Sequence, residues 1–150
     1  MHKTNINFGS KKWIRNIPNI ETQTKKILKN SIKLKKKLKI KNTEISILLT
    51  DTDDMKKINT KFRNKRNDTD VLSFPSQHPS FFKKKLKLNK IYLGDLALSF
   101  GYIQKQKTNF EEYYKNILVH GFLHLIGYDH NNKKNYLLME KAHKKILNTL

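Results

Sequence analysis

Three histidines within eleven residues constrain this chain more than any other feature of its sequence. His120 and His124 are four residues apart, so on a helix their side chains lie on one face, with Cβ atoms roughly 5–6 Å apart. Gly127 suits the end of that helix, because a residue without a Cβ adopts a left-handed turn at little cost. The chain can then turn back and bring His130 to the same point. The spacing predicts a helix, a glycine turn and three converging imidazoles.

Three neutral imidazoles that meet at one point are typical of a catalytic zinc site whose fourth position is open to water. We therefore predict that His120, His124 and His130 bind one zinc ion, although imidazole also suits nickel or another divalent ion. The alternative is that these are unrelated core or surface residues. Half of the six histidines fall in this segment at a known ligand spacing, which favours the metal. We expect His143, in a lysine-rich segment, at the surface rather than as a fourth ligand.

The residue after the first histidine separates two kinds of hydrolase. The spacing of the three histidines and the glycine also matches the zinc motif of metzincin proteases, in which a glutamate follows the first histidine as general base. Here that position is Gly121, which cannot transfer a proton. A metallopeptidase is therefore disfavoured. A metal-bound water still suits another electrophile, and a phosphodiester fits this basic chain better than a peptide does.

Composition indicates a soluble protein, and its charge favours a polyanionic partner without establishing one. The length of 150 residues predicts one domain, 1–150, and the absence of cysteine rules out disulfides. No apolar run approaches the length needed to cross a bilayer, so we expect no membrane partner and a cytoplasmic location. The net charge of +20 favours nucleic acid as partner. Lysine, asparagine and isoleucine are enriched together, however, as an A+T-rich genome would produce, so the charge supports a function without establishing one.

Hydrophobic periodicity predicts an α+β fold, a small mixed sheet of about four strands packed with about five helices. The expected strands cover residues 5–8, 45–49, 71–75 and 91–98, and the expected helices cover residues 20–38, 53–62, 99–107, 110–126 and 133–150. Thr108 and Glu111 fit a capping box at the start of the fourth helix. In the last helix the inward positions are expected to be Leu137, Leu138, Ala142, Ile146 and Leu147. The metal site is then on and just after a central, buried helix.

Two further features leave alternatives open. Asp95 lies in an apolar run and is expected to be buried, so its carboxylate needs a partner, which is either a metal-binding imidazole or loop amides. Phe81 and Phe82 precede three lysines in a surface segment of residues 77–89. They either clamp a single nucleic-acid strand or pack the loop onto the body, and we favour packing.

Several segments, in order, resemble one known family, the YbeY-type bacterial endoribonucleases. The segments that carry the resemblance are Asn59 with Phe62-Arg63, Thr69-Asp70-Val71-Leu72-Ser73-Phe74-Pro75, Leu93-Gly94-Asp95-Leu96, His120-Gly121-x-Leu123-His124-Leu125-x-Gly127-Tyr128-Asp129-His130, and Met139. The match runs from about residue 45 to the C-terminus. The resemblance implies an α+β, single-strand-specific metalloendoribonuclease that acts in ribosomal RNA maturation, chiefly at the small-subunit 3′ end, and in ribosome quality control.

The resemblance also assigns roles to residues. It implies that the three histidines are metal ligands and that Arg63 lines the catalytic cleft, where a guanidinium can hold a phosphate bidentately. His120 and Arg63 are therefore the candidate catalytic residues. Asp70, Asp95 and Asp129 are candidates for support of the site. The chain departs from the family in its higher basic charge and its lysine-rich segment 77–89.

A second reading is an RNA- or ribosome-binding assembly factor whose metal is mainly structural. A structural site is closed by a fourth protein ligand, whereas a catalytic site keeps that position open. The expected partners in either case are RNA, chiefly ribosomal RNA, and the ribosome.

Overall fold

A computed structural model describes residues 1–34, 38–84 and 86–150 of the chain. The elements follow one another in the order β1 (His2–Phe8), α1 (Lys12–Asn16), α2 (Ile20–Leu34), β2 (Leu38–Thr50), α3 (Thr52–Arg63), β3 (Val71–Pro75), the 3-10 turn η1 (Pro79–Lys83), β4 (Leu86–Ser99), α4 (Phe100–Gln104), α5 (Phe110–Leu125) and α6 (Lys133–Leu147). None of the helices in the described ranges is long and apolar enough to span a bilayer.

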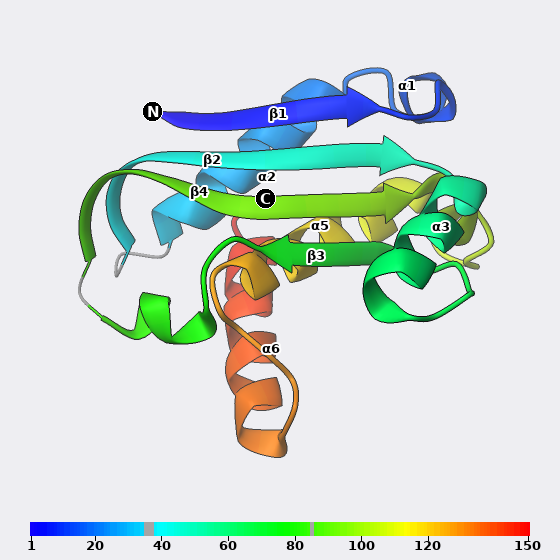
Figure 1. Cartoon of the computed structure of the whole chain (residues 1–150). Helices are drawn as coiled ribbons and strands as arrows, with labels where there is room; N and C mark the ends of the chain where they lie inside the picture. Colours follow the sequence, from blue (N-terminus) through cyan, green and yellow to red (C-terminus); the bar gives the residue numbers. More distant parts are fainter. Residues whose placement is uncertain (35–37, 85) are drawn as a thin grey trace.

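The four strands form one mixed sheet in the order β1-β2-β4-β3 (Figure 1). Strands β1, β2 and β4 run parallel to one another, and the short edge strand β3 is antiparallel to β4. The α+β class and the four-stranded mixed sheet predicted from the sequence are confirmed. The described residues contain six α-helices rather than about five, because the segment around the buried Trp13 forms the additional short helix α1.

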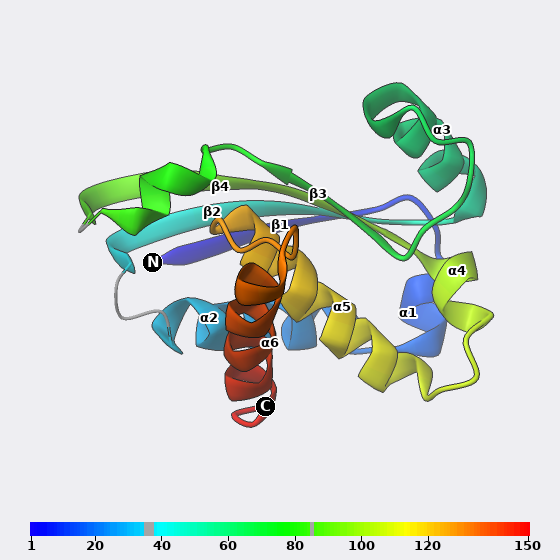
Figure 2. The same ribbon diagram turned by 90° about the horizontal axis from the view of Figure 1, so that it is seen from below.

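The sheet divides the molecule into a thick layer and a thin one (Figure 2). Helices α2, α5 and α6 lie on one side of the sheet, and α3 stands alone on the other. Alternate residues of the central strands, such as Ile47, Leu49, Leu96 and Leu98, are buried in the main core on the α2 and α5 side. This core is the platform that carries the histidines.

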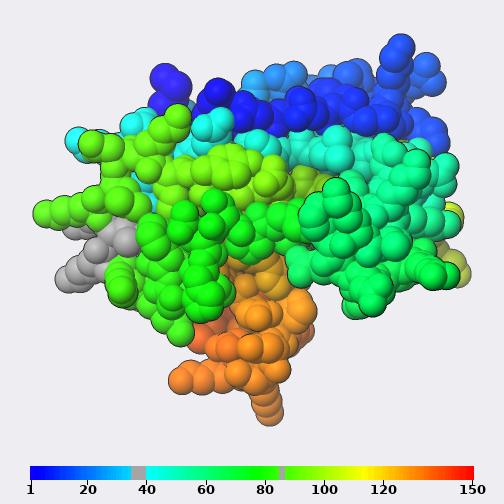
Figure 3. All heavy atoms as spheres, viewed as in Figure 1, coloured from blue at the N-terminus to red at the C-terminus, as the bar shows by residue number. Residues whose placement is uncertain are grey.

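The thin layer covers only part of its side of the sheet. Met55 of α3 packs with Leu72 of β3 and Ala97 of β4 in a small separate cluster, with Leu48 and Phe74 partly buried against it. In Figure 3, which faces this side, atoms of β2 and β4 are visible beside α3. The rest of this face is therefore left to solvent.

The incompletely covered face explains why the prediction that Asp95 is buried is wrong. A bulge opposite the Glu44–Ile45 step shifts the register of β4 by one residue, so Ile45 pairs with Gly94 and Ser46 pairs with Asp95. Asp95 is exposed and accepts a hydrogen bond of 2.7 Å from the Tyr92 hydroxyl. An apolar run therefore need not be buried on both faces, and the carboxylate takes neither of its expected partners.

Several helix ends and one cap differ from the prediction, since α4 ends at Gln104 rather than at residue 107 and α6 ends at Leu147 rather than at residue 150. The helix predicted over residues 20–38 ends at Leu34, because Leu38 already belongs to β2, and the lysines at 35–37 lie outside the described residues. The start of α5 is capped by the Asn109 side chain, which accepts a hydrogen bond from the Glu112 amide, and not by Thr108. Asparagine and threonine are both good caps, so the two positions compete in the sequence.

The predicted inward face of the last helix is partly wrong. Leu137 and Leu138 are 55% and 52% exposed, whereas Met139, Ala142 and Ile146 are buried. The N-terminal half of α6 projects from the body in Figure 1, so only the face through Met139 meets another helix. Periodicity alone does not show where a helix leaves its neighbour.

Phe81 and Phe82 pack their segment onto the body of the protein, as favoured from the sequence. Both rings are partly buried against the main core, and their centroids are 5.3 Å apart in an edge-to-face arrangement. Segment 77–89 is not one surface excursion, because η1 occupies its middle and β4 begins at Leu86.

Candidate metal centre

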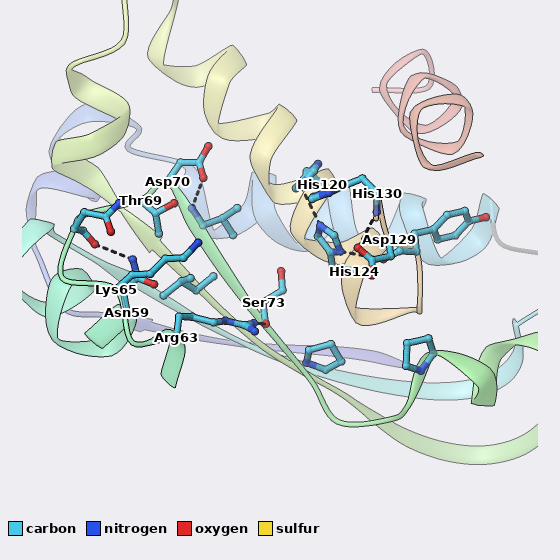
Figure 4. Close-up of a pocket in the computed structure, with 16 residues that line it drawn as sticks. Asn59, Arg63, Lys65, Thr69, Asp70, Ser73, His120, His124, Asp129 and His130 are labelled. Atoms are coloured by element: carbon cyan, nitrogen blue, oxygen red, sulfur yellow. Dashed lines mark hydrogen bonds between the residues drawn. The ribbon is translucent and has the colours of Figure 1, made fainter. Parts of the chain in front are cut away.

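Helix α5 and the turn after it bring the three histidines together. The ligand nitrogens of His120, His124 and His130 all lie within 4.8 Å of one another, and the two Nε2 atoms on α5 are 3.1 Å apart. The ring of His130 lies 5.1 Å from that of His124 and 5.7 Å from that of His120, centroid to centroid. The three side chains point toward one another in Figure 4.

The turn that returns His130 is a Schellman motif. The amide of Gly127 donates to the His124 carbonyl, and the amide of Tyr128 donates to the Leu123 carbonyl. Gly127 has φ of +96°, and a Cβ there would lie 3.0 Å from the Pro79 carbonyl oxygen. The glycine turn predicted from the sequence is therefore confirmed, and the close approach of Pro79 adds a second reason for glycine.

The same turn orients one imidazole. His124 Nδ1 donates a hydrogen bond of 2.9 Å to the Tyr128 carbonyl oxygen. A proton on Nδ1 leaves the lone pair on Nε2, which is the atom facing His120. Backbone carbonyls hold metal-binding histidines in this way in many proteins, so the donor set fits a divalent ion that accepts imidazole nitrogen.

The surroundings keep the helix imidazoles neutral. Burial lowers the pKa of His120 to about 4, and the nearby His124, His143 and His130 act in the same direction, whereas Asp70 opposes them. Burial also lowers the pKa of His124. Metal binding requires neutral imidazole, so both side chains are in the binding form at neutral pH.

A fourth imidazole lies nearby without joining the group. The ring of His143 on α6 is 6.2 Å from that of His120, and its Nε2 lies 3.1 Å from the Asn116 carbonyl oxygen. Among the described residues, no other histidine or carboxylate belongs to the converging set. His143 is partly buried rather than fully at the surface.

Gly121 faces the sheet and not the histidines. A Cβ at this position would lie 3.0 to 3.3 Å from side-chain atoms of Leu96, Val71 and Ser73. Helix α5 therefore packs closely on β3 and β4, and a side chain as large as glutamate has no space here. From the sequence, Gly121 meant that the general base of a metzincin protease is absent. The structure adds a steric reason for glycine, which is the close packing of α5 on the sheet.

Arg63 approaches the histidines from the other side of the sheet edge. It is the last residue of α3, which ends there because Asn64 takes a left-handed conformation with φ of +55°. Its Nη2 donates a hydrogen bond of 2.7 Å to the carbonyl oxygen of Ser73 on β3. Its charge contributes to the lowered pKa of His124, so the two groups sense each other electrostatically.

Asp70 is fixed at the start of β3. Its two carboxylate oxygens accept hydrogen bonds of 2.7 Å from the Val71 amide and 2.8 Å from the Tyr113 hydroxyl. Burial and the carboxylate together raise the pKa of Tyr113, so the hydroxyl remains a donor. Asp129 is exposed and accepts from the His130 amide at 2.7 Å. Asp70 and Asp129 therefore lie beside the histidines, whereas Asp95 lies on the opposite face of the sheet.

These groups surround one polar cleft with a volume of about 570 Å³. Figure 4 shows the histidines on one side of it and Arg63, Lys65, Thr69 and Asp70 spread along the other. Asn59, which is buried, donates to the Asn67 carbonyl oxygen and fixes the loop that carries Lys65 and Thr69. The cleft therefore combines a candidate metal centre with cationic groups.

Comparison with known proteins identifies the family. The family model described as "Endoribonuclease YbeY" matches residues 5–150. The chain belongs to the endoribonuclease YbeY family. A relative named endoribonuclease YbeY from Pelagibacter ubique is 39% identical over 134 residues, covering 86% of this chain and 83% of the relative. Another, from Buchnera aphidicola subsp. Schizaphis graminum, is 34% identical over 151 residues, covering 97% and 89%.

A solved structure supports the fold of this family member independently. The solution structure of a Thermotoga maritima protein aligns with a TM-score of 0.56 and 22% identity, covering 97% of this chain and 90% of the other. The family resemblance seen in the sequence is confirmed by the family model and the two relatives.

Two residues that hold groups of the cleft in place, Tyr113 and Ser73, were given no such role from the sequence. Tyr113 lies seven residues before His120, two helical turns earlier on the same face of α5, and that spacing is a signal that the sequence carried. Ser73 touches the site twice, through its carbonyl oxygen to Arg63 and through its hydroxyl, which donates to the Gly121 carbonyl oxygen at 3.2 Å. Only the packing of β3 on α5 reveals the role of Ser73.

Proposed function

We propose that this protein is a zinc-dependent endoribonuclease that cuts single-stranded RNA. Its proposed cellular role is ribosomal RNA processing in the cytoplasm, at the 3′ end of the small-subunit RNA, together with ribosome quality control. Residues 1–150 are proposed to form one domain with this activity. The support is membership of the endoribonuclease YbeY family and a net charge of +20, which suits a polyanionic substrate.

One observation carries the proposal. Three imidazoles converge within 4.8 Å on one side of a cleft that Arg63 lines from the other side. Three histidines with no fourth protein ligand among the described residues are typical of a catalytic rather than a structural zinc centre. The assembly-factor alternative, which needs a mainly structural metal, is therefore the weaker one. A peptidase is disfavoured because Gly121 supplies no base.

Each side chain of the cleft has a proposed task. His120, His124 and His130 hold the metal, which when bound supplies a Lewis acid and an activated water. Arg63 uses one N–H on Ser73, and the remaining N–H groups of its guanidinium are available to the scissile phosphate. Fixed donors that face developing charge on phosphorus lower the barrier most effectively. Asp70 and Asp129 support the arrangement, and nickel or another divalent ion is the alternative occupant.

The test is cleavage of end-labelled RNA by the zinc-loaded protein. A single strand and a duplex of the same sequence are compared, with His124→Ala as the inactive variant and His143→Ala as the matched histidine control. We expect cleavage of the single strand by the wild type and His143→Ala, none by His124→Ala, and recovery after chelation only when metal is returned. Intact RNA with persistent ribosome binding by the zinc-loaded wild type would instead establish the assembly factor.

A further inference from the structure

Phe62 carries an aromatic ring that the fold leaves mostly exposed. All eight phenylalanines lie in the described part of the chain, and Phe62 alone is exposed, at 57%. It is the residue before Arg63 at the end of α3. Its ring meets Phe74 edge-to-face, with centroids 5.2 Å apart and planes at 64°, and this contact holds the ring upright against β3.

The ring forms one wall of a hollow on the thin side of the sheet. The hollow has a volume of about 370 Å³, within the range of small-ligand pockets. Its walls are mainly apolar and include Ile58, Leu48 and Ala97, and Asp95 is a polar group among them. A flat apolar ring with polar edges is the kind of ligand that matches such walls.

The hollow and the histidine cleft meet across the edge strand β3. Ser73 and Pro75 line the cleft, whereas Phe74, between them, lines the hollow, because alternate side chains of a strand point to opposite faces. Arg63 bridges the two, since it donates to the Ser73 carbonyl oxygen while its guanidinium carbon lies 5.5 Å from the centre of the Phe74 ring. An RNA strand with one phosphate bound at Arg63 can therefore place a neighbouring nucleotide in the hollow.

Charge favours a nucleic acid over a second copy of this chain as the occupant. The Lys61 ammonium lies 5.2 Å from the centre of the Phe62 ring, and with Arg63 it places a cation on each side of Phe62 in the sequence. A protein of net charge +20 repels its own copies. Aromatic rings beside cations are the usual platform for single-stranded nucleic acid, because the ring stacks on a base and the cation binds a phosphate.

We propose that the hollow between Phe62 and Phe74 binds an unpaired nucleobase of the RNA, next to the phosphate held by Arg63. The inference rests on the proposed endoribonuclease function and adds a physical basis for its single-strand preference. A base in a duplex is stacked and paired, so it enters the hollow only after unpairing. Phe62 is then a substrate-binding residue, separate from the metal centre.

The first experiment reports stacking directly. The chain has one tryptophan, Trp13, which is fully buried, so a Phe62→Trp variant adds a single exposed fluorophore. Zinc-loaded protein is titrated in the cold, before cleavage progresses, with single-stranded RNA and with the same RNA carrying one abasic nucleotide at successive positions. We expect saturable quenching of the new tryptophan by the intact RNA, and loss of that quenching at one abasic position.

The second experiment measures affinity by fluorescence anisotropy of labelled RNA. Phe62→Ala is expected to weaken binding on the order of 10-fold for the intact strand and to cause no further loss for the strand lacking that base. Leu137→Ala, which removes another exposed apolar side chain on α6 outside the hollow, is expected to bind like the wild type.

The outcomes separate the two proposals. Suppose that RNA does not quench the tryptophan of Phe62→Trp and that Phe62→Ala binds RNA as tightly as the wild type. The proposal of a base-binding hollow is then wrong, while the endoribonuclease function stands. If Phe62→Ala keeps its RNA affinity but loses binding to a protein partner, the hollow is a protein-docking surface and the inference is wrong. If the wild type neither binds nor cleaves RNA, the proposed function fails and the inference fails with it.

Discussion

The two sides of strand β3 carry surfaces of opposite character. On the α5 side, three imidazoles are held by a helix, a glycine turn and a backbone carbonyl, all within the short segment from His120 to His130. On the α3 side, Phe62 and Phe74 line an apolar hollow that exists only because segments distant in the sequence meet at a sheet edge. The first surface suits chemistry that needs fixed geometry, and the second suits recognition of a ligand by shape and stacking.

Arg63 is the residue that joins the two surfaces, and among replacements outside the three histidines its loss should reduce cleavage most. In Arg63→Ala we expect a fall in the cleavage rate of about 10²–10³-fold, the usual cost of removing a group that stabilises charge in the transition state. The zinc content should not change. Arg63→Lys should restore little activity, because an ammonium cannot hold a phosphate bidentately.

The control for Arg63 is Arg66→Ala, three residues later in the loop that follows α3. Arg66 is exposed and does not line the cleft, so its loss removes the same charge without the geometry. Rates are measured under single-turnover conditions. If both variants lost the same activity, Arg63 would act only through net charge, and the bridge between the two surfaces would be absent.

Replacement of Gly94 should disturb both surfaces together, because it should lower the stability of the fold around β3. It has φ of +137°, and a Cβ there would lie 2.3 Å from the Phe74 carbonyl oxygen. In Gly94→Ala we expect the free energy of unfolding to fall by about 3 kcal/mol, from strain and from displacement of β3. Urea denaturation measures the change, with Ser76→Ala, an exposed neighbour, as control. A Gly94→Ala protein as stable as the wild type would show that β3 is not held by this close approach.

The contrast between the surfaces also explains what the sequence could predict. The convergence of the histidines is determined locally, by a spacing of four residues and by the glycine turn that follows. The sequence therefore predicts it. The exposure of Asp95 depends on a bulge in β4 and on how far α3 extends over the sheet, neither of which leaves a periodic signal. The strand from Val71 to Pro75 was predicted with its observed bounds, but its two-sided role required the order of strands in the sheet.

Long-range contacts account for the other differences. Arg63 donates to the carbonyl oxygen of Ser73, which is ten residues away along the chain and on another element. The sequence therefore placed Arg63 in the cleft by family resemblance and not by geometry. The exposure of Leu137 and Leu138 reflects where α6 leaves the body. Helical periodicity indicates that a face is apolar but does not show how much of it finds a partner.

The smallest effect is expected on α6, away from both surfaces. Leu137→Ala should change the free energy of unfolding by less than about 0.5 kcal/mol, since the side chain is 55% exposed. Met139→Ala, two residues further on and 4% exposed, should cost about 2–5 kcal/mol. Thermal and urea denaturation of the pair test this assignment. A larger loss in Leu137→Ala than in Met139→Ala would mean that the packed face of α6 is the one predicted from periodicity.

The central claim is that His120, His124 and His130 together hold one metal ion, and zinc analysis of the purified variants tests it most directly. The wild type and His143→Ala should each contain about one zinc per chain after loading and desalting, and His120→Ala should contain almost none, with circular dichroism confirming that it is folded. Unchanged zinc in folded His120→Ala would contradict the claim, because the metal would then be held elsewhere.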